Sequence, residues 1–357
     1  MLVLKNRVAA ARELLQRFDI DAILISDMKD IRYLSGFTGS EGLLLVGGDE
    51  MSLLIDFRYT SQAKAETTGC TVIEFREKKN TLASVISEQH IKSLGVQAEK
   101  VSVSFYNELV EHLSTIRFVL LGAEVALLRI IKDSQEIEYL EKTAKLASKA
   151  LLDIVQTLKP GDRERDIALR LEIAMRTAGA DDTAFDFIVA SGERGALPHG
   201  RATTKEICPG ELVTIDFGAL LDGYNSDETV TVAIGEPNEK QRQLYQIVKD
   251  AHDQALDAVR PGVTFQRLDA IARDHIAQKG YGDYFGHGLG HGVGLDIHEK
   301  PVVSFRNEDV VREGMVFTIE PGIYLPGWGG VRIEDLVVVT SDGCRLLSGV
   351  PKDLMVL

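Results

Sequence analysis

Two acidic residues interrupt a stretch of the chain that otherwise has the pattern of an apolar β-hairpin. Asp216 lies at the centre of "LVTIDFG", and Asp227 follows eleven residues later. Asp222 and Gly223 lie between them and predict a two-residue hairpin turn. With that turn, Asp216 would face Thr229 and lie diagonally across from Asp227, roughly 7 Å away on one face of the ribbon.

Carboxylates this close repel each other unless a proton or a cation lies between them. For this pair alone a simpler interpretation stays open, in which one aspartate belongs to a turn and the other is exposed. A second stretch, "GMVFTIEPGIYLPGWGGVRIEDLVVVT", carries Glu320 and Glu334 within two apolar strand patterns, where a lone buried carboxylate would be costly. Four such carboxylates suit hard or borderline cations, Mn²⁺ first, with Co²⁺ or Zn²⁺ also tolerated.

Three histidines, His287, His291 and His298, lie within twelve residues in "FGHGLGHGVGLDIHEKP". A single histidine is more often structural than a ligand. Three together, flanked by glycines that let the backbone approach a site closely, favour a ligand or catalytic role. The glycines do not match GxGxxG, and HExxH and GxSxG are absent, which excludes a dinucleotide loop, a zincin and a serine hydrolase of the familiar kind.

The elements that must position these residues are predicted to form two domains, residues 1–127 and 128–357, because 357 residues is long for one core. The first part alternates apolar runs with helical patterns, which is typical of a layered α/β domain. Its strands are predicted at 21–26, 42–48, 51–57, 71–75, 100–105 and 117–122, and two of its helices at 7–18 and 80–94.

The second part begins with a long helix, predicted over 131–158. Asp133 or Ser134 would be its N-cap, and Glu136 or Glu138 would lie in its first turn.

A faint internal repeat follows. Residues 158–179 and 259–280 both contain a basic-Pro-Gly start, an amphipathic helix and a closing glycine at the same interval. The alternative is a chance similarity between two ordinary helix starts. Because the acidic pairs follow each copy at corresponding places, we predict a duplicated helix-helix-strand-strand unit about a pseudo-twofold axis.

Composition narrows the possible partners and the compartment. The formal charge of −14 argues against nucleic acid or an anionic membrane as the main partner. The three cysteines, Cys70, Cys208 and Cys344, form no CxxC pair, so we expect free thiols in a reducing, cytoplasmic environment and no sulfur-based metal site. No apolar run approaches the length of a membrane span, and the N-terminus is predicted to be a helix rather than a signal peptide.

The order of the candidate ligands resembles the five-ligand dinuclear site of the pita-bread metallopeptidases, which include methionine aminopeptidase, aminopeptidase P and prolidase. "LPHGRAT", "HGLGHGVGLDIHE", "EPGIY", "GGVRIED" and the N-terminal "IRYLSGFTGSEG" resemble the Xaa-Pro branch in particular. The resemblance covers nearly the whole chain. It implies a creatinase-like α/β domain followed by a C-terminal α+β pita-bread domain with a pseudo-twofold repeat.

The resemblance also implies how two divalent ions are held, most naturally Mn²⁺. Asp216 and Glu334 would bridge both ions, and Asp227 and His291 would also be ligands. Glu320 would bind one ion and move the proton.

Five further side chains receive roles from the same resemblance. His298 would stabilise the tetrahedral intermediate, and His199 would contact the substrate. Arg332 and Tyr324 would support the bridging aspartate, and His287 would lie in the substrate pocket.

The activity implied is that of a metallo-exopeptidase that cleaves the Xaa-Pro bond, either in dipeptides or at the N-terminus of longer peptides, using a hydroxide between the ions. Family members are commonly homodimers, and we expect one here. A creatinase-like amidinohydrolase and a non-catalytic peptide-binding protein are the alternatives. The complete ligand set disfavours the first, and the retained His298 disfavours the second. Dipeptidase and aminopeptidase remain alternatives at this stage.

The chain departs from its relatives at one position. It has "SDETVT" where they have Ser-Asp-x-Thr-Arg-Thr, so Val230 replaces an arginine. Strand alternation predicts that Val230 points away from the face of Asp227 and Thr229. We therefore expect the metal site to be intact.

Overall fold

The computed structural model describes residues 2–357. The chain divides after Arg129 into two compact units, here called the N-terminal and C-terminal units. The sequence placed this boundary two residues earlier. None of the helices in residues 2–357 combines the length and the apolar character that a membrane span requires.

The N-terminal unit is built on one six-stranded sheet with the order β4-β3-β2-β1-β5-β6. β2 runs antiparallel to β1 and β3, and the other neighbours are parallel. Its strands are β1 (Ala22–Ile25), β2 (Leu43–Gly47), β3 (Met51–Ile55), β4 (Thr71–Glu74), β5 (Ser93–Gln97) and β6 (Arg117–Leu121). Its helices are α1 (Leu2–Phe18), α2 (Met28–Ser35), α3 (Thr60–Glu66), α4 (Lys78–Glu88) and α5 (Val103–His112). β1, β2 and β3 are buried along their whole length, as expected for strands covered on both faces.

Two predictions in this unit were wrong. Residues 100–105 do not form a strand, because the Ser102 hydroxyl accepts a hydrogen bond from Phe105 N and caps α5. The helix predicted over 80–94 corresponds to α4, which ends at Glu88. Residues 93 and 94 of that prediction are instead the first two residues of β5. The other five predicted strands contain observed ones.

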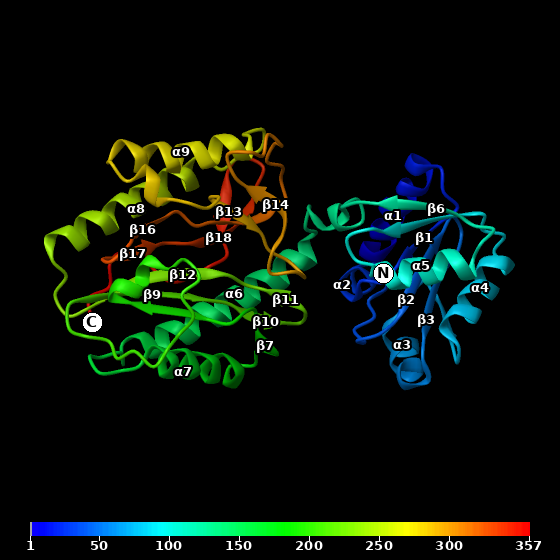
Figure 1. The fold of residues 1–357 in the computed structure, drawn as a ribbon, viewed down its shortest axis with the longest axis horizontal. Coiled ribbons are helices and arrows are strands. Elements are labelled where there is room, and N and C mark those ends of the chain that lie inside the picture. The colour runs from blue at the N-terminus through cyan, green and yellow to red at the C-terminus, as the bar shows by residue number, and fades with distance from the viewer. Residues whose placement is uncertain (1) are drawn as a thin grey trace. The chain divides into compact units, whose positions relative to one another are not determined.

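The C-terminal unit has four long helices in two pairs. These are α6 (Ser134–Val155) with α7 (Glu164–Thr177), and α8 (Glu239–Asp257) with α9 (Phe265–Gln278). In Figure 1, α6 and α7 lie on one side of the strands, and α8 and α9 lie on the opposite side. Each pair packs over its own buried apolar cluster.

The strands between the helix pairs form four sheets, with the orders β11-β10-β7, β12-β9-β8, β14-β13-β15-β18-β19 and β16-β17. The first half contributes β7 (Asp182–Thr183), β8 (Ile188–Ser191), β9 (Glu211–Phe217), β10 (Ala219–Leu221), β11 (Tyr224–Asn225) and β12 (Glu228–Ile234). The second contributes β13 (Gly290–Gly292), β14 (Glu299–Val303), β15 (Val316–Ile319), β16 (Gly322–Leu325), β17 (Gly329–Arg332), β18 (Asp335–Val339) and β19 (Cys344–Leu346).

The internal repeat is visible in the helices. α7 and α9 are each 14 residues long. α6 and α8, which precede them, both begin with a capping box, formed by Asp133 with Glu136 and by Asn238 with Gln241. The predicted N-cap at Asp133 is therefore confirmed, and each half of the unit starts in the same way.

The predicted hairpin register is also confirmed. Asp222 and Gly223 both have positive φ, 50° and 74°, as a type I′ turn requires. Asp216 pairs with Thr229. A further bridge joins Thr229 to Glu334, so the strands of the two halves meet at the candidate ligands.

Candidate metal centre

One cavity of about 1080 Å³ in the C-terminal unit brings together all ten side chains that the sequence identified. They are His199, Asp216, Asp227, His287, His291, His298, Glu320, Tyr324, Arg332 and Glu334. Their proximity is a feature of the structure, whereas the individual roles remain predictions.

The five candidate ligands lie on or directly beside five different strands. Asp216 lies on β9 and His291 on β13. The other three lie at strand ends rather than inside strands: Asp227 precedes β12, Glu320 follows β15 and Glu334 precedes β18. The sequence had placed both glutamates within continuous strands, and the breaks beside them let their side chains turn towards the cavity.

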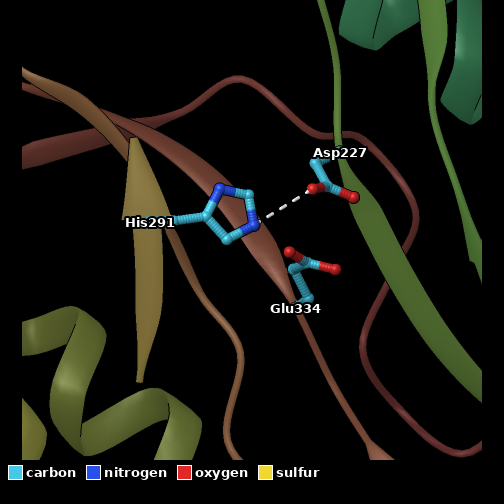
Figure 2. A group of neighbouring side chains, drawn as sticks. All are labelled: Asp227, His291 and Glu334. Carbon is cyan, nitrogen blue, oxygen red and sulfur yellow. Dashed lines mark ion pairs between the residues drawn. The ribbon is translucent and has the colours of Figure 1, made fainter. Parts of the chain in front are cut away.

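Three of these side chains meet closely, as Figure 2 shows. Ligand atoms of Asp227, His291 and Glu334 all lie within 4.8 Å of one another. His291 Nε2 lies 3.4 Å from Asp227 Oδ2 and 3.4 Å from Glu320 Oε1. An imidazole among three carboxylates is a donor set that borderline divalent cations bind.

Asp216 has one engaged and one open oxygen. Arg332 Nη2 donates to Asp216 Oδ2 at 2.5 Å. Asp216 Oδ1 is buried and has no hydrogen-bond partner among the described residues. A buried carboxylate oxygen without a partner is costly, so this oxygen fits the role of a metal ligand.

The pKa values of the cavity carboxylates also indicate a site for cations. Burial and the neighbouring negative charges raise the pKa of Asp227 to about 7 and raise the pKa of Glu334 well above its usual value. Burial raises the pKa of Asp216 too, although Arg332 opposes the change. Although burial lowers the pKa of His291, its bond to Asp227 and the charge of Glu320 raise it to about 9. The cluster therefore carries excess negative charge that protons or cations must balance, and the residues fit divalent cations.

Two threonines that the sequence analysis missed orient the ligands. Thr229 Oγ1 donates to Glu334 Oε2 at 2.6 Å. Thr318 Oγ1 donates to Glu320 Oε1 at 3.1 Å and accepts from His291 N. The register could have revealed Thr229, which faces Asp216, and the two-residue alternation could have revealed Thr318.

Arg332 contacts Asp216 directly, as expected, whereas Tyr324 reaches Asp216 only through Arg332. Arg332 Nη1 donates to the Tyr324 hydroxyl at 3.0 Å, and that hydroxyl lies 2.9 Å from His287 Nε2. Tyr324 is thus linked to Asp216 through Arg332. Burial raises the pKa of Tyr324 to about 12, so the phenol remains protonated.

The remaining two histidines face the same cavity. The His298 ring lies 4.2 Å from the His291 ring, centroid to centroid. Burial and the charge of His291 lower the pKa of His298, so its imidazole is neutral near pH 7. His199 follows Pro198, whose carbonyl oxygen accepts from Arg332 Nη1 at 3.1 Å.

A buried glutamate fixes the segment that carries His199. Glu164 is fully buried at the start of α7 and accepts hydrogen bonds from Ser191, Arg194 and Thr203. These bonds tie both ends of residues 191–203 to the helix, which holds the His199 segment against the cavity.

Val230 lies outside this chemistry. Its side chain is buried in the apolar cluster beneath α6 and α7, where it pairs with Ile215. Because the neighbouring residues in β12 alternate between faces, the change from arginine leaves the cavity face intact.

The duplicated helix-strand unit encloses a carboxylate-histidine centre of the kind that metal-dependent hydrolases use. Comparison with known families agrees. Residues 138–341 match the model of metallopeptidase family M24, and residues 7–131 match the Creatinase/Prolidase N-terminal domain. The chain therefore belongs to metallopeptidase family M24, and the fold and family expected from the sequence are confirmed.

Relatives resemble the chain over its full length. An Xaa-Pro dipeptidase of Pyrococcus horikoshii is 40% identical over 99% of this chain and 100% of its own. The structure of an Xaa-Pro dipeptidase from Bacillus anthracis has a TM-score of 0.96 and 39% identity, covering 99% of this chain and 100% of that one. The structure of an X-Pro aminopeptidase from Thermotoga maritima has a TM-score of 0.90 and 40% identity, covering 96% and 99%.

Proposed function

We propose that this metallopeptidase cleaves the bond that precedes proline, with two divalent cations, Mn²⁺ first. The observation that carries the proposal is the single cavity in which five potential ligands meet three further histidines. The names of the relatives from Pyrococcus horikoshii, Bacillus anthracis and Thermotoga maritima support the Xaa-Pro specificity.

The metal would be held by Asp216, Asp227, His291, Glu320 and Glu334. Bound cations would supply Lewis-acid polarisation of the scissile carbonyl and activation of a water molecule. The open Asp216 oxygen and the raised pKa of Asp227 support this assignment.

Glu320 is the side chain best placed to move the proton. Thr318 and His291 hold its Oε1 atom at 3.1 and 3.4 Å, and its side chain is only 17% exposed. A prolyl nitrogen carries no N–H of its own in the peptide bond, so the leaving amine must receive a proton. Glu320 would accept that proton from the attacking water and deliver it to the nitrogen.

His298 would donate a hydrogen bond to the oxygen on which negative charge develops. Its lowered pKa keeps the ring neutral, and a neutral imidazole has one N–H to donate. His298 lines the cavity and is exposed there, so a bound substrate can reach its N–H. His199 and His287 would contact the substrate from the neighbouring walls.

We further propose that the enzyme is a cytoplasmic homodimer. Cys70, Cys208 and Cys344 are all free in the structure, which suits a reducing compartment. Phe57 and Val103 of the N-terminal unit are 76% and 77% exposed and offer apolar surface to a partner subunit. Sedimentation equilibrium tests the dimer, and fractionation of cells that express the protein tests the location.

The activity is tested with metal-stripped protein and Mn²⁺ added back. Ala-Pro, Ala-Pro-Ala and the control dipeptide Ala-Ala serve as substrates, and release of free alanine is measured for the first two. We expect Mn²⁺-dependent release from a proline substrate and little cleavage of Ala-Ala. Cleavage of Ala-Ala alone, or of no substrate, would contradict the proposal.

A further inference from the structure

One continuous row of paired backbone positions runs past the cavity. Arg201 forms a β-bridge with Ile188, Ile188 pairs with Asp216, and Asp216 pairs with Thr229. Thr229 is bridged in turn to Glu334. Directly opposed residues in a sheet project from the same face, so Arg201 shares the face of the two proposed bridging ligands.

Acidic, apolar and basic side chains follow one another along this row. Asp216 and Glu334 form an acidic end, and Ile188 provides an apolar step that is only 7% exposed. Arg201 follows, two strand spacings from Asp216, or roughly 10 Å between Cα atoms. All four side chains line the cavity.

Arg201 is the accessible guanidinium of the cavity. Arg332, the other arginine in the lining, is buried and engaged by Asp216, Tyr324 and a backbone carbonyl. The Arg201 side chain is 80% exposed and lies 2.9 Å from Asp186, which is 72% exposed. Exposed ion pairs of this kind are weak, so a ligand carboxylate can displace Asp186.

The backbone of Arg201 is nevertheless fixed. Arg194 Nη2 donates to Arg201 O at 2.7 Å, and Arg194 is itself bound to the buried Glu164. A flexible charged side chain on a fixed backbone suits recognition of a small anion near the reacting bond.

We propose that Arg201 binds the free carboxylate of an Xaa-Pro dipeptide and so makes the enzyme favour dipeptides over longer peptides. This inference rests on the proposed Xaa-Pro activity. With the scissile carbonyl at the acidic end, the pyrrolidine ring lies over Ile188, and the carboxylate, which immediately follows the ring, faces Arg201. Guanidinium binds carboxylate through two parallel hydrogen bonds. A longer peptide has a neutral amide at this position and forfeits that interaction.

The test compares Ala-Pro with Ala-Pro amide, in which a neutral carboxamide replaces the carboxylate. The Mn²⁺-loaded wild-type enzyme is compared with Arg201→Gln and with the matched control Arg163→Gln. Arg163 lies outside the cavity lining and forms a surface ion pair with Glu206, in which the two side chains are 45% and 60% exposed. Because Arg201 is exposed, thermal melting is expected to show the same stability for all three proteins.

For Arg201→Gln we expect kcat/KM on Ala-Pro to fall about tenfold to a hundredfold, mainly through KM, with less than a threefold change on the amide. Wild-type enzyme should prefer Ala-Pro to the amide by a similar factor, a measurement that needs no variant. Equal losses on both substrates, or no loss on Ala-Pro, would overturn the role of Arg201. Wild-type protein that cleaves neither substrate would instead contradict the proposed function itself.

Discussion

Two clusters of buried charge lie back to back on the same strands. Asp227 and Glu334 face the cavity. The next residue in each case, Glu228 or Asp335, faces the opposite way, as strand alternation requires. Behind the cavity, Lys352 Nζ lies 2.5 Å from Glu228 and 3.2 Å from Asp335.

In the cluster behind the cavity, here called the rear cluster, basic side chains of the protein neutralise the charges of Glu228 and Asp335. His252 adds a second basic group, with Nε2 at 3.2 Å from Asp335. Burial raises the pKa of Asp335, but Lys352 and His252 outweigh it and hold that pKa below its usual value. Despite its own burial, the pKa of Lys352 is raised by Glu228 and Asp335.

The front cluster lacks such a balance. Its four candidate ligand carboxylates are accompanied by two basic groups, Arg332 and His291, and the pKa of His291 is raised to about 9. The pKa values of Asp227 and Glu334 are raised. Burial also raises the pKa of Glu228 in the rear cluster, although Lys352 opposes the change, so the clusters differ chiefly in their balance of acidic and basic groups. Buried carboxylates that are matched by basic side chains hold the strands together, whereas carboxylates in excess over the nearby basic groups are available to bind cations.

The largest effect is expected from removing a charge at the front. Glu334→Gln should lose bound Mn²⁺ and reduce kcat/KM about a thousandfold or more. Without metal, the Glu334→Gln variant should be no less stable to urea than the wild-type protein, because one source of carboxylate repulsion is gone. Glu308→Gln, at an exposed position, is the control. Activity within tenfold of wild type, with metal still bound, would contradict the ligand assignment.

Removing the lysine of the rear cluster should instead lower the stability of the fold. Lys352→Met leaves Glu228 and Asp335 buried without their lysine, which should lower the free energy of unfolding by about 3–5 kcal/mol. Urea unfolding followed by fluorescence of Trp328, the sole tryptophan, reports on the C-terminal unit. Lys279→Met, at an exposed position on the surface, controls for the loss of one positive charge. A loss below about 1 kcal/mol would contradict the role of the rear cluster in stabilising the fold.

Metal binding should separate the two clusters directly. At a Mn²⁺ concentration of about 100 times Kd, the C-terminal unit should gain about 2.7 kcal/mol of stability for each ion bound. Lys352→Met should retain this gain because its front cluster is intact, and Glu334→Gln should lose most of it. Urea titrations of each protein with and without Mn²⁺ measure the difference, and an equal gain in both variants would refute the division between front and rear.

The front cluster could be predicted from the sequence because its residues violate local patterns. Asp216, Glu320 and Glu334 interrupt apolar runs, and the turn at Asp222 and Gly223 fixes the register that brings the first of them opposite Thr229. Turn chemistry and hydrophobic alternation are local properties, so a single sequence contains them.

The rear cluster could not be predicted in this way. Lys352 lies 124 residues from Glu228 along the chain, and an isolated lysine or histidine in a sequence does not indicate its partner. The same limit applies to Glu164, whose bonds to Thr203 span 39 residues. The error at 100–105 has a different cause: "KVSVSF" alternates like a strand, but a single side-chain cap at Ser102 starts a helix instead.

The smallest effect is expected from Thr229, whose hydroxyl orients Glu334 in the front cluster. Thr229→Val keeps the shape of the side chain but removes the 2.6 Å hydrogen bond to Glu334. Loss of such a supporting bond should weaken Mn²⁺ binding about tenfold, measured by calorimetric titration. Thr229→Ser keeps the hydroxyl and should remain within about threefold of wild type.

Thr214→Val provides the matched control, since this variant also loses a buried hydroxyl, one that contacts Thr231. If Thr214→Val and Thr229→Val weaken metal binding equally, the effect belongs to the general loss of buried hydrogen bonds. A selective effect of Thr229→Val would show that the front cluster depends on oriented ligands as well as on its excess charge.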